Sequence, residues 1–121
     1  MSTSVNFDGI LNLSTLSNTL TVSGGFDDPN KTTLTFVGTI TQDGPIGEND
    51  AAVAVSGTFS RLPTVGEKDT FNFQVKGGGG TVPVNVQFFD NSDAQYGSLT
   101  GSVPDVFADC TGTGNGYWKT T

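Results

Sequence analysis

The sequence predicts an all-β protein: a single antiparallel domain of about eight short strands, either a β-sandwich of jelly-roll or Greek-key type or a small closed β-barrel. Apolar and polar residues alternate with a period of two along the whole chain, and no window has the period of an amphipathic helix. Clusters of Gly, Asn, Asp, Ser and Pro interrupt the alternation at short intervals. Strands this close in sequence pair through hairpins and Greek-key connections, which makes the sheet antiparallel.

The 121 residues are most simply one domain, spanning residues 1–121. The alternating segments between turn clusters define the expected strands. They are residues 5–13, 19–26, 32–42, 51–60, 70–76, 81–89, 98–103 and a last segment near 113–119.

The alternation also predicts which side chains face the core. In "FNFQVK" the apolar residues Phe71, Phe73 and Val75 share one phase, and the polar residues between them share the other. Because the same holds in "VPVNVQF", each strand is expected to have one buried and one solvated face.

Glycine occupies the inward phase of four expected strands, at Gly24, Gly38, Gly57 and Gly101. A glycine inside a strand packs no side chain, and it usually marks a bulge, a tight bend or a close approach of another group. Several such positions predict a strongly curved sheet, or a groove floor for a bulky Phe or a ligand. The bend is favoured over a ligand cavity.

Charge and composition exclude several partners. The net charge is −7 and the five cations are scattered, so the chain repels phosphate backbones and anionic lipid surfaces. We therefore expect neither nucleic acid nor a membrane as a partner. The single cysteine, Cys110, forms no intrachain disulfide, and the first residues lack the features of a signal peptide. The sequence thus indicates a cytoplasmic protein, or a secreted one if a leader has been removed.

Several catalytic chemistries are absent. With no histidine, the chain has no Ser/His/Asp or Cys/His mechanism and no histidine-ligated metal. One cysteine cannot build a thiolate zinc site or an iron–sulfur cluster, and no phosphate-binding glycine loop is found. Carboxylates, lysines, tyrosines and unactivated hydroxyl groups remain for catalysis.

Acidic residues gather in loops, as in "QDGPIGEND" with Asp43, Glu48 and Asp50. Oxygen ligands on a flexible loop suit calcium, so these three are the candidate metal ligands. Their spacing matches no EF-hand, and Asp and Asn are also common turn formers. Solvated turns are therefore favoured, and no cofactor is expected.

The polar-tipped aromatic residues suggest a ligand site in Asx-rich and glycine-rich segments. Sugar rings stack on such aromatic faces while Asp and Asn bind the hydroxyl groups. The candidate ligand-binding residues are Asp90, Asn91, Asp93 and Tyr96 in "DNSDAQYG", and Asn115, Tyr117 and Trp118 in "GNGYWK". The alternative is that these rings belong to the core; since adjacent strand residues face opposite ways, one of Tyr117 and Trp118 is expected inside and the other outside.

These observations favour a non-catalytic binding module, lectin-like or specific for another small polar ligand, that uses loops on a rigid scaffold. One alternative is a structural subunit that assembles with copies of itself, for which an exposed Phe89 would mark the contact. A second alternative is a small barrel enzyme that uses carboxylate acid–base chemistry.

Overall fold

The computed structural model describes residues 4–14, 17–44, 50–75, 81–104 and 110–121. It contains eight strands: β1 (Val5–Ser14), β2 (Thr19–Phe26), β3 (Thr33–Gly44), β4 (Asp50–Phe59), β5 (Lys68–Val75), β6 (Thr81–Phe89), β7 (Gln95–Pro104) and β8 (Cys110–Thr120). Among the described residues there is no helix long and apolar enough to cross a membrane.

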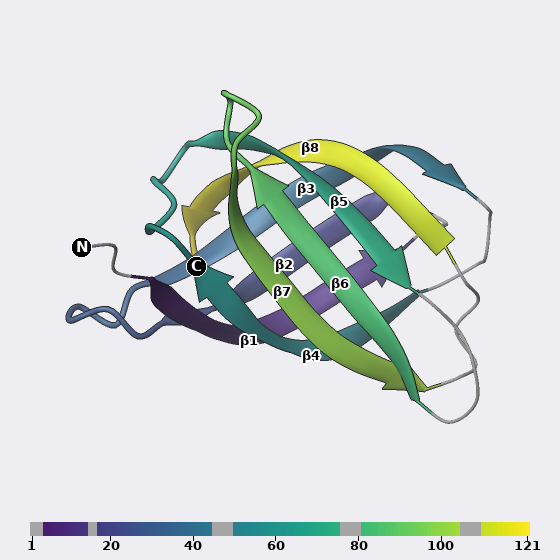
Figure 1. The fold of residues 1–121 in the computed structure, drawn as a ribbon, viewed down its shortest axis with the longest axis horizontal. Helices are drawn as coiled ribbons and strands as arrows, with labels where there is room; N and C mark the ends of the chain where they lie inside the picture. Colours follow the sequence, from purple (N-terminus) through teal and green to yellow (C-terminus); the bar gives the residue numbers. More distant parts are fainter. Residues whose placement is uncertain (1–3, 15–16, 45–49, 76–80, 105–109) are drawn as a thin grey trace.

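The eight strands form a closed barrel in which every neighbouring pair is antiparallel (Figure 1). The order around the barrel is β1-β2-β3-β8-β5-β6-β7-β4, and β4 closes it by pairing with β1. The predicted all-β class is therefore confirmed, and of the two predicted architectures the protein adopts the barrel. Each strand has a neighbour on both sides, and the shortest ladder is that of β4 with β7, which pairs Val55–Phe59 with Gly97–Gly101.

The eight predicted strands correspond one to one with those observed, and most bounds agree within two residues. The largest differences are at the starts of β7 and β8, each of which begins three residues before the predicted start. In β7 the reason is a register shift opposite Phe88 and Phe89, which interrupts the alternation on which the prediction rests.

The barrel consists of two halves with the same topology. Read from β4, the order is β4-β1-β2-β3 and then β8-β5-β6-β7, so each half has the 4-1-2-3 order of a Greek key. If each strand is replaced by the strand four later in the sequence, counting β1 again after β8, the order around the barrel is unchanged. Thus β1 corresponds to β5, β2 to β6, β3 to β7 and β4 to β8.

Aromatic rings fill the centre of the barrel. Trp118, from β8, has none of its surface exposed. Its ring centroid lies 5.2 Å from that of Phe36, 5.4 Å from Phe88 and 5.8 Å from Phe59, mostly in tilted or edge-to-face geometry. Such contacts add favourable quadrupole interactions to the burial of apolar surface, so the interior is a packed core.

The inward glycines make room for these rings and for neighbouring strands. A Cβ atom on Gly38 would lie 2.7 Å from the ring of Phe36 and 2.8 Å from that of Phe71. On Gly24, Gly57 and Gly101 it would lie 2.2, 1.9 and 2.5 Å from a backbone carbonyl oxygen of an adjacent strand. In all four places the glycine permits a close approach, and an aromatic ring occupies the groove over Gly38.

One end of the barrel carries both chain ends and three connections, residues 27–32, 60–67 and 90–94 (Figure 1). We call it the termini end. It carries the features considered as a functional site.

Candidate functional site

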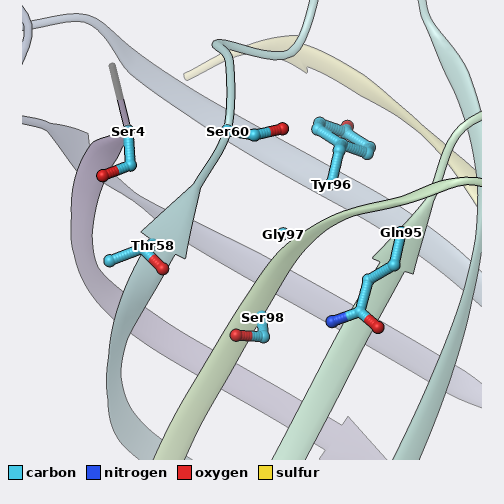
Figure 2. A pocket seen from close by; sticks show the side chains of 7 residues that line it. All are labelled: Ser4, Thr58, Ser60, Gln95, Tyr96, Gly97 and Ser98. Atoms are coloured by element: carbon cyan, nitrogen blue, oxygen red, sulfur yellow. The ribbon is translucent and has the colours of Figure 1, made fainter. Parts of the chain in front are cut away.

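An open hollow of about 360 Å³ lies at the termini end, on the outer side of the contact between β4 and β7. Figure 2 shows the residues that line it, which are Ser4, Thr58, Ser60, Gln95, Tyr96, Gly97 and Ser98. Four of these carry a hydroxyl group on a short side chain, one carries an amide, and none carries a charge.

The hollow follows from the pairing of β4 with β7. Thr58 lies directly opposite Ser98, and their short side chains face outward into the hollow (Figure 2). One step further, Phe59 lies opposite Gly97, where a Cβ atom would come within 2.3 Å of the Phe59 ring. The pairing then ends with a hydrogen bond of 2.7 Å from the Ser60 N–H to the Tyr96 carbonyl oxygen.

A bulge turns Tyr96 inward. Phe88 pairs with Gly97 and Phe89 pairs with Gln95, so Tyr96 is the extra residue on β7. A bulge of this kind re-aims a side chain across the sheet. Tyr96 is consequently buried beside Gly97, although adjacent strand residues normally face opposite ways. One edge of Tyr96 lines the hollow, and its hydroxyl group reaches the barrel interior.

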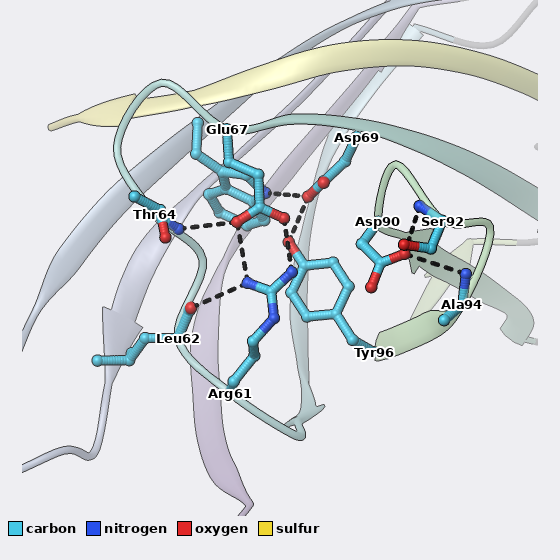
Figure 3. Close-up of polar contacts among 10 residues, drawn as sticks. Arg61, Leu62, Thr64, Glu67, Asp69, Asp90, Ser92, Ala94 and Tyr96 are labelled. Atoms are coloured by element: carbon cyan, nitrogen blue, oxygen red, sulfur yellow. Dashed lines mark hydrogen bonds and ion pairs between the residues drawn. The ribbon is translucent and has the colours of Figure 1, made fainter.

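The Tyr96 hydroxyl group donates a hydrogen bond to Oδ2 of Asp69, the first inward residue of β5 (Figure 3). The same oxygen accepts a hydrogen bond of 2.8 Å from Nε1 of Trp118. Asp69 is only 2% exposed, and its other oxygen, Oδ1, has no hydrogen-bond donor among the described residues. Asp69 is thus a carboxyl group in the aromatic core with one oxygen satisfied and one not.

Glu67 and Arg61, both in the connection between β4 and β5, cover this carboxyl group. The Arg61 guanidinium binds both oxygens of Glu67, at 2.9 and 2.8 Å, and the Thr64 N–H donates to Glu67 Oε1 at 3.0 Å. Arg61 also lies 4.1 Å from the centre of the Tyr96 ring, in a cation–π contact. Figure 3 shows how Arg61, Glu67, Asp69 and Tyr96 form one network.

The two acids have pKa values on opposite sides of the usual carboxyl range. Burial, together with the neighbouring Glu67 carboxylate, raises the pKa of Asp69 to about 6. Burial alone would also raise the pKa of Glu67, but hydrogen bonds from Arg61, Asp69 and Thr64 outweigh it and lower the pKa to about 2. Burial and the contact with Asp69 raise the pKa of Tyr96 well above its ordinary value. The pair Glu67–Asp69 therefore holds one proton in mildly acidic solution, and that proton belongs to Asp69.

A proton on Oδ1 explains the geometry of Asp69. A protonated Oδ1 carries no charge, so burying it without a donor costs less than burying a carboxylate oxygen there. Paired carboxyl groups with separated pKa values are also the usual apparatus of acid–base catalysis. Here, however, Asp69 is buried beneath Tyr96 and both Glu67 oxygens are occupied by Arg61, so neither group meets a molecule in the hollow.

The predicted loop residues Asp90, Asn91 and Asp93 form the turn between β6 and β7. Asp90 Oδ1 accepts hydrogen bonds from the N–H groups of Ser92 at 2.8 Å and Ala94 at 3.1 Å. Asp93 has a φ of 63°, a left-handed conformation that Asp and Asn tolerate better than most residues. These side chains shape the turn, and of the first predicted group only Tyr96 lines the hollow.

The second group of predicted residues, in "GNGYWK", lies on both faces of β8. Asn115 and Tyr117 lie on the outer face of β8, with Tyr117 44% exposed, whereas Trp118 lies inside with no exposed surface. The prediction that one of Tyr117 and Trp118 packs inside is confirmed. The suggested combination of Trp118 with Asn115 around a sugar is wrong, because the two residues lie on opposite sides of the sheet and the Trp118 ring does not reach solvent.

The remaining predictions concern metal and assembly. The side chains of Asp43, Glu48 and Asp50 lie outside the described part of the chain, as does that of Cys110. Within the part that the structure describes, no three acidic or thiol side chains come together as a metal site. Phe89, suggested as an exposed subunit contact, is half-buried beside the β7 bulge.

Sequence analysis missed the residues of the buried network, although one signal was present. In "EKDTFNFQV" the inward phase of Phe71 and Phe73 extends back to Asp69 and Glu67. Because the predicted strand begins at residue 70, the alternation assigns no face to Asp69, and the predicted core contains no carboxyl group.

The comparisons with known proteins establish the fold alone. No protein-family model matches the sequence, and no match appears among the curated proteins. Among solved structures, the chain is similar to the virulence-associated protein VapB from the intracellular pathogen Rhodococcus equi, with a TM-score of 0.60 and 18% sequence identity over 100% of both chains. At this identity the similarity shows that the two chains share a β-barrel architecture.

Proposed function

We propose that this protein is a non-catalytic binding module whose ligand is a neutral polyhydroxylated molecule of the carbohydrate class, bound in the hollow between β4 and β7. The observation that carries the proposal is the chemistry of the lining. Hydroxyl groups of Ser4, Thr58, Ser60 and Ser98 and the amide of Gln95 surround the hollow without a charged side chain among them.

Hydroxyl and amide groups can each donate and accept hydrogen bonds, which matches the alternating donors and acceptors of a sugar. A site without charge avoids the desolvation of an ion, and it gives no reason to favour an anionic or cationic ligand. An open hollow of about 360 Å³ is at the lower end of the range for small-molecule sites, which suits one or two sugar residues bound weakly.

A rigid floor supports such a site. Tyr96 is fixed by its hydrogen bond to Asp69, by Arg61 on its ring and by an edge contact with Phe59, whose centroid is 5.6 Å away. Ordering these groups in advance lowers the entropic cost of binding. The two acids of the network do not line the hollow: Glu67 binds Arg61, and Asp69 binds Tyr96 and Trp118.

The test is a screen of the protein on an array of neutral oligosaccharides, followed by calorimetry with the strongest binder. The double variant Thr58→Val with Ser98→Ala removes two hydroxyl groups that face each other in the hollow. Each lost hydrogen bond is worth about 0.5–1.5 kcal/mol, so we expect affinity to fall about tenfold.

A matched control lies two residues away along the same strand pair. Ser56 and Thr100 are also opposite each other and exposed, but neither lines the hollow, so Ser56→Ala with Thr100→Val makes the same chemical change outside the site. This control is expected to bind within twofold of the unaltered protein. An array with no binder, or equal losses in the two double variants, would reject the proposal.

A further inference from the structure

Asp69 occupies a core position in a part of the barrel where the other half has apolar residues. In the first half, Phe7 lies opposite Gly57 and Val5 lies opposite Phe59. In the second half, Asp69 lies opposite Gly116. Two residues further along β8, the Trp118 N–H donates to the Glu67 carbonyl oxygen at 3.1 Å.

The strand order relates β5 to β1, whose inward residues at this end, Val5 and Phe7, are both apolar. Phe7 is 1% exposed and packs on Phe26 at 4.8 Å between ring centroids, so apolar residues serve the barrel well in this part of the strand. The architecture does not require a carboxyl group there. A buried carboxyl group with an unsatisfied oxygen is costly, and such local conflicts concentrate at functional sites.

In the second half of the barrel, unlike the first, this position is connected to the hollow. Asp69 binds the hydroxyl group of Tyr96, and Tyr96 is the bulged residue that joins the barrel interior to the hollow lining. The groups that face the Asp69 carboxyl are Tyr96 from β7, Trp118 from β8, and Glu67 with its partner Arg61 from the β4–β5 connection.

We propose that Asp69 is a positioning residue of the hollow: its protonated carboxyl group, bonded to the hydroxyl group of Tyr96, holds Tyr96 and the first residues of β7 in place, so that binding in the hollow depends on that proton. This inference rests on the proposed function. Loss of the proton places a second negative charge beside Glu67, on an oxygen that has no donor among the described residues. That charge is relieved by admitting water or by moving the pair, and Tyr96 moves with it.

The direct test follows the ¹⁵N spectrum of the full chain from pH 5 to pH 8. Because the chain has a single tryptophan, its indole signal is assigned without ambiguity, and the hydrogen bond to Asp69 makes that signal sensitive to the protonation of the carboxyl group. We expect the backbone amide signals of Gly97 and Ser98 to move with the same midpoint as the indole signal, while that of Thr21, in β2, does not. Asp69→Asn mimics the protonated carboxyl group and is expected to abolish these movements.

Glu67→Gln provides a second variant in case Asp69→Asn does not fold. It removes the neighbouring negative charge, so the common midpoint should move to lower pH. The inference is overturned if the indole signal titrates while Gly97 and Ser98 stay still, or if their movements persist in Asp69→Asn.

Affinity measurements separate this inference from the proposed function. With the oligosaccharide found by the array, we expect binding at least fivefold weaker at pH 8 than at pH 5, and a difference below twofold in Asp69→Asn. Equal affinity at both pH values would overturn the role of Asp69 and leave the sugar site standing. If no sugar binds at any pH, the proposed function fails, and the amide signals alone decide whether Asp69 controls Gly97 and Ser98.

Discussion

Asp69 and Trp118 are joined inside the barrel by a hydrogen bond of 2.8 Å from the indole Nε1 to a carboxyl oxygen, across 49 residues of sequence. Trp118 thereby has two tasks. Its ring packs at the centre of the aromatic core, and its N–H donates to the carboxyl oxygen that also accepts from the Tyr96 hydroxyl group. The packing of the core and the burial of a carboxyl group are thus linked through one pair of side chains.

The stability of the protein should depend on pH through Asp69 and Glu67. Asp69 has a folded-state pKa of about 6, above its ordinary value of 3.8, so its contribution is fully present at low pH and is lost as the pH rises through 6. Glu67 has a folded-state pKa of about 2, below 4.5, so its contribution is present above 4.5 and is lost as the pH falls through 2. The two together contribute most near pH 4–5.

Between pH 5 and pH 7 we expect this pair to lose about 1–1.5 kcal/mol of the free energy of unfolding. Asp69→Asn should remove that loss and make the protein more stable than the unaltered chain at pH 7. Urea unfolding at several pH values measures the loss of unfolding free energy with pH and the difference in unfolding free energy between Asp69→Asn and the unaltered chain. The explanation fails if the difference between the two proteins is the same at pH 5 and pH 7.

Two adjacent glycines in β2 should respond oppositely to alanine. A Cβ atom on Gly24 would lie 2.2 Å from the Asp8 carbonyl oxygen and 2.6 Å from the Gly9 Cα, so Gly24→Ala should cost about 2–3 kcal/mol of unfolding free energy. On Gly25 the nearest atom would be 3.7 Å away, so Gly25→Ala should be neutral or stabilising by up to about 1 kcal/mol. Thermal unfolding followed by circular dichroism checks the pair, and equal effects would contradict the close approach of β1 and β2.

The aromatic neighbours in β8 provide a second matched comparison. Trp118→Phe removes packing at the centre of the core and leaves Asp69 with one donor fewer, so we expect a loss of about 2–4 kcal/mol. Tyr117→Phe removes only a hydroxyl group from a ring that is 44% exposed, and it should change stability by less than about 0.5 kcal/mol. Denaturant midpoints followed by circular dichroism give both values. A costly Tyr117→Phe would mean that its hydroxyl group has a role that the described contacts do not include.

Most of the fold was predictable from the sequence because alternation in a half-buried strand is strict. A shift of one residue would turn every side chain of a strand to the wrong face. In β5, for example, a shift of one residue would turn Phe71 and Phe73 to solvent and bury Asn72 and Gln74. The choice between barrel and sandwich was not predictable, because it depends on which distant strands pair, such as β3 with β8 and β4 with β7.

The site was much less predictable, for two physical reasons. The bulge at Tyr96 reverses the phase of one residue, and its position depends on the pairing of β6 with β7, which the sequence does not display. The exposure of Trp118 was open because a polar-tipped ring suits either a core or a surface. Its distance of three residues from Asn115 nevertheless places the two on opposite faces of any regular strand.

Tyr96→Phe isolates the hydrogen bond between the hollow and the buried carboxyl group. The Tyr96 hydroxyl group stabilises the charged form of Asp69, so its removal should raise the pKa of Asp69 above 6. The midpoint of the Trp118 indole signal, measured by ¹⁵N spectroscopy, should therefore move to higher pH, while the aromatic packing against Phe59 is retained. Tyr117→Phe removes the same group from the outer face and should leave the midpoint unchanged. An unmoved midpoint in Tyr96→Phe would show that the hydroxyl group does not bind Asp69 in solution, and the connection from the core to the hollow would then be lost.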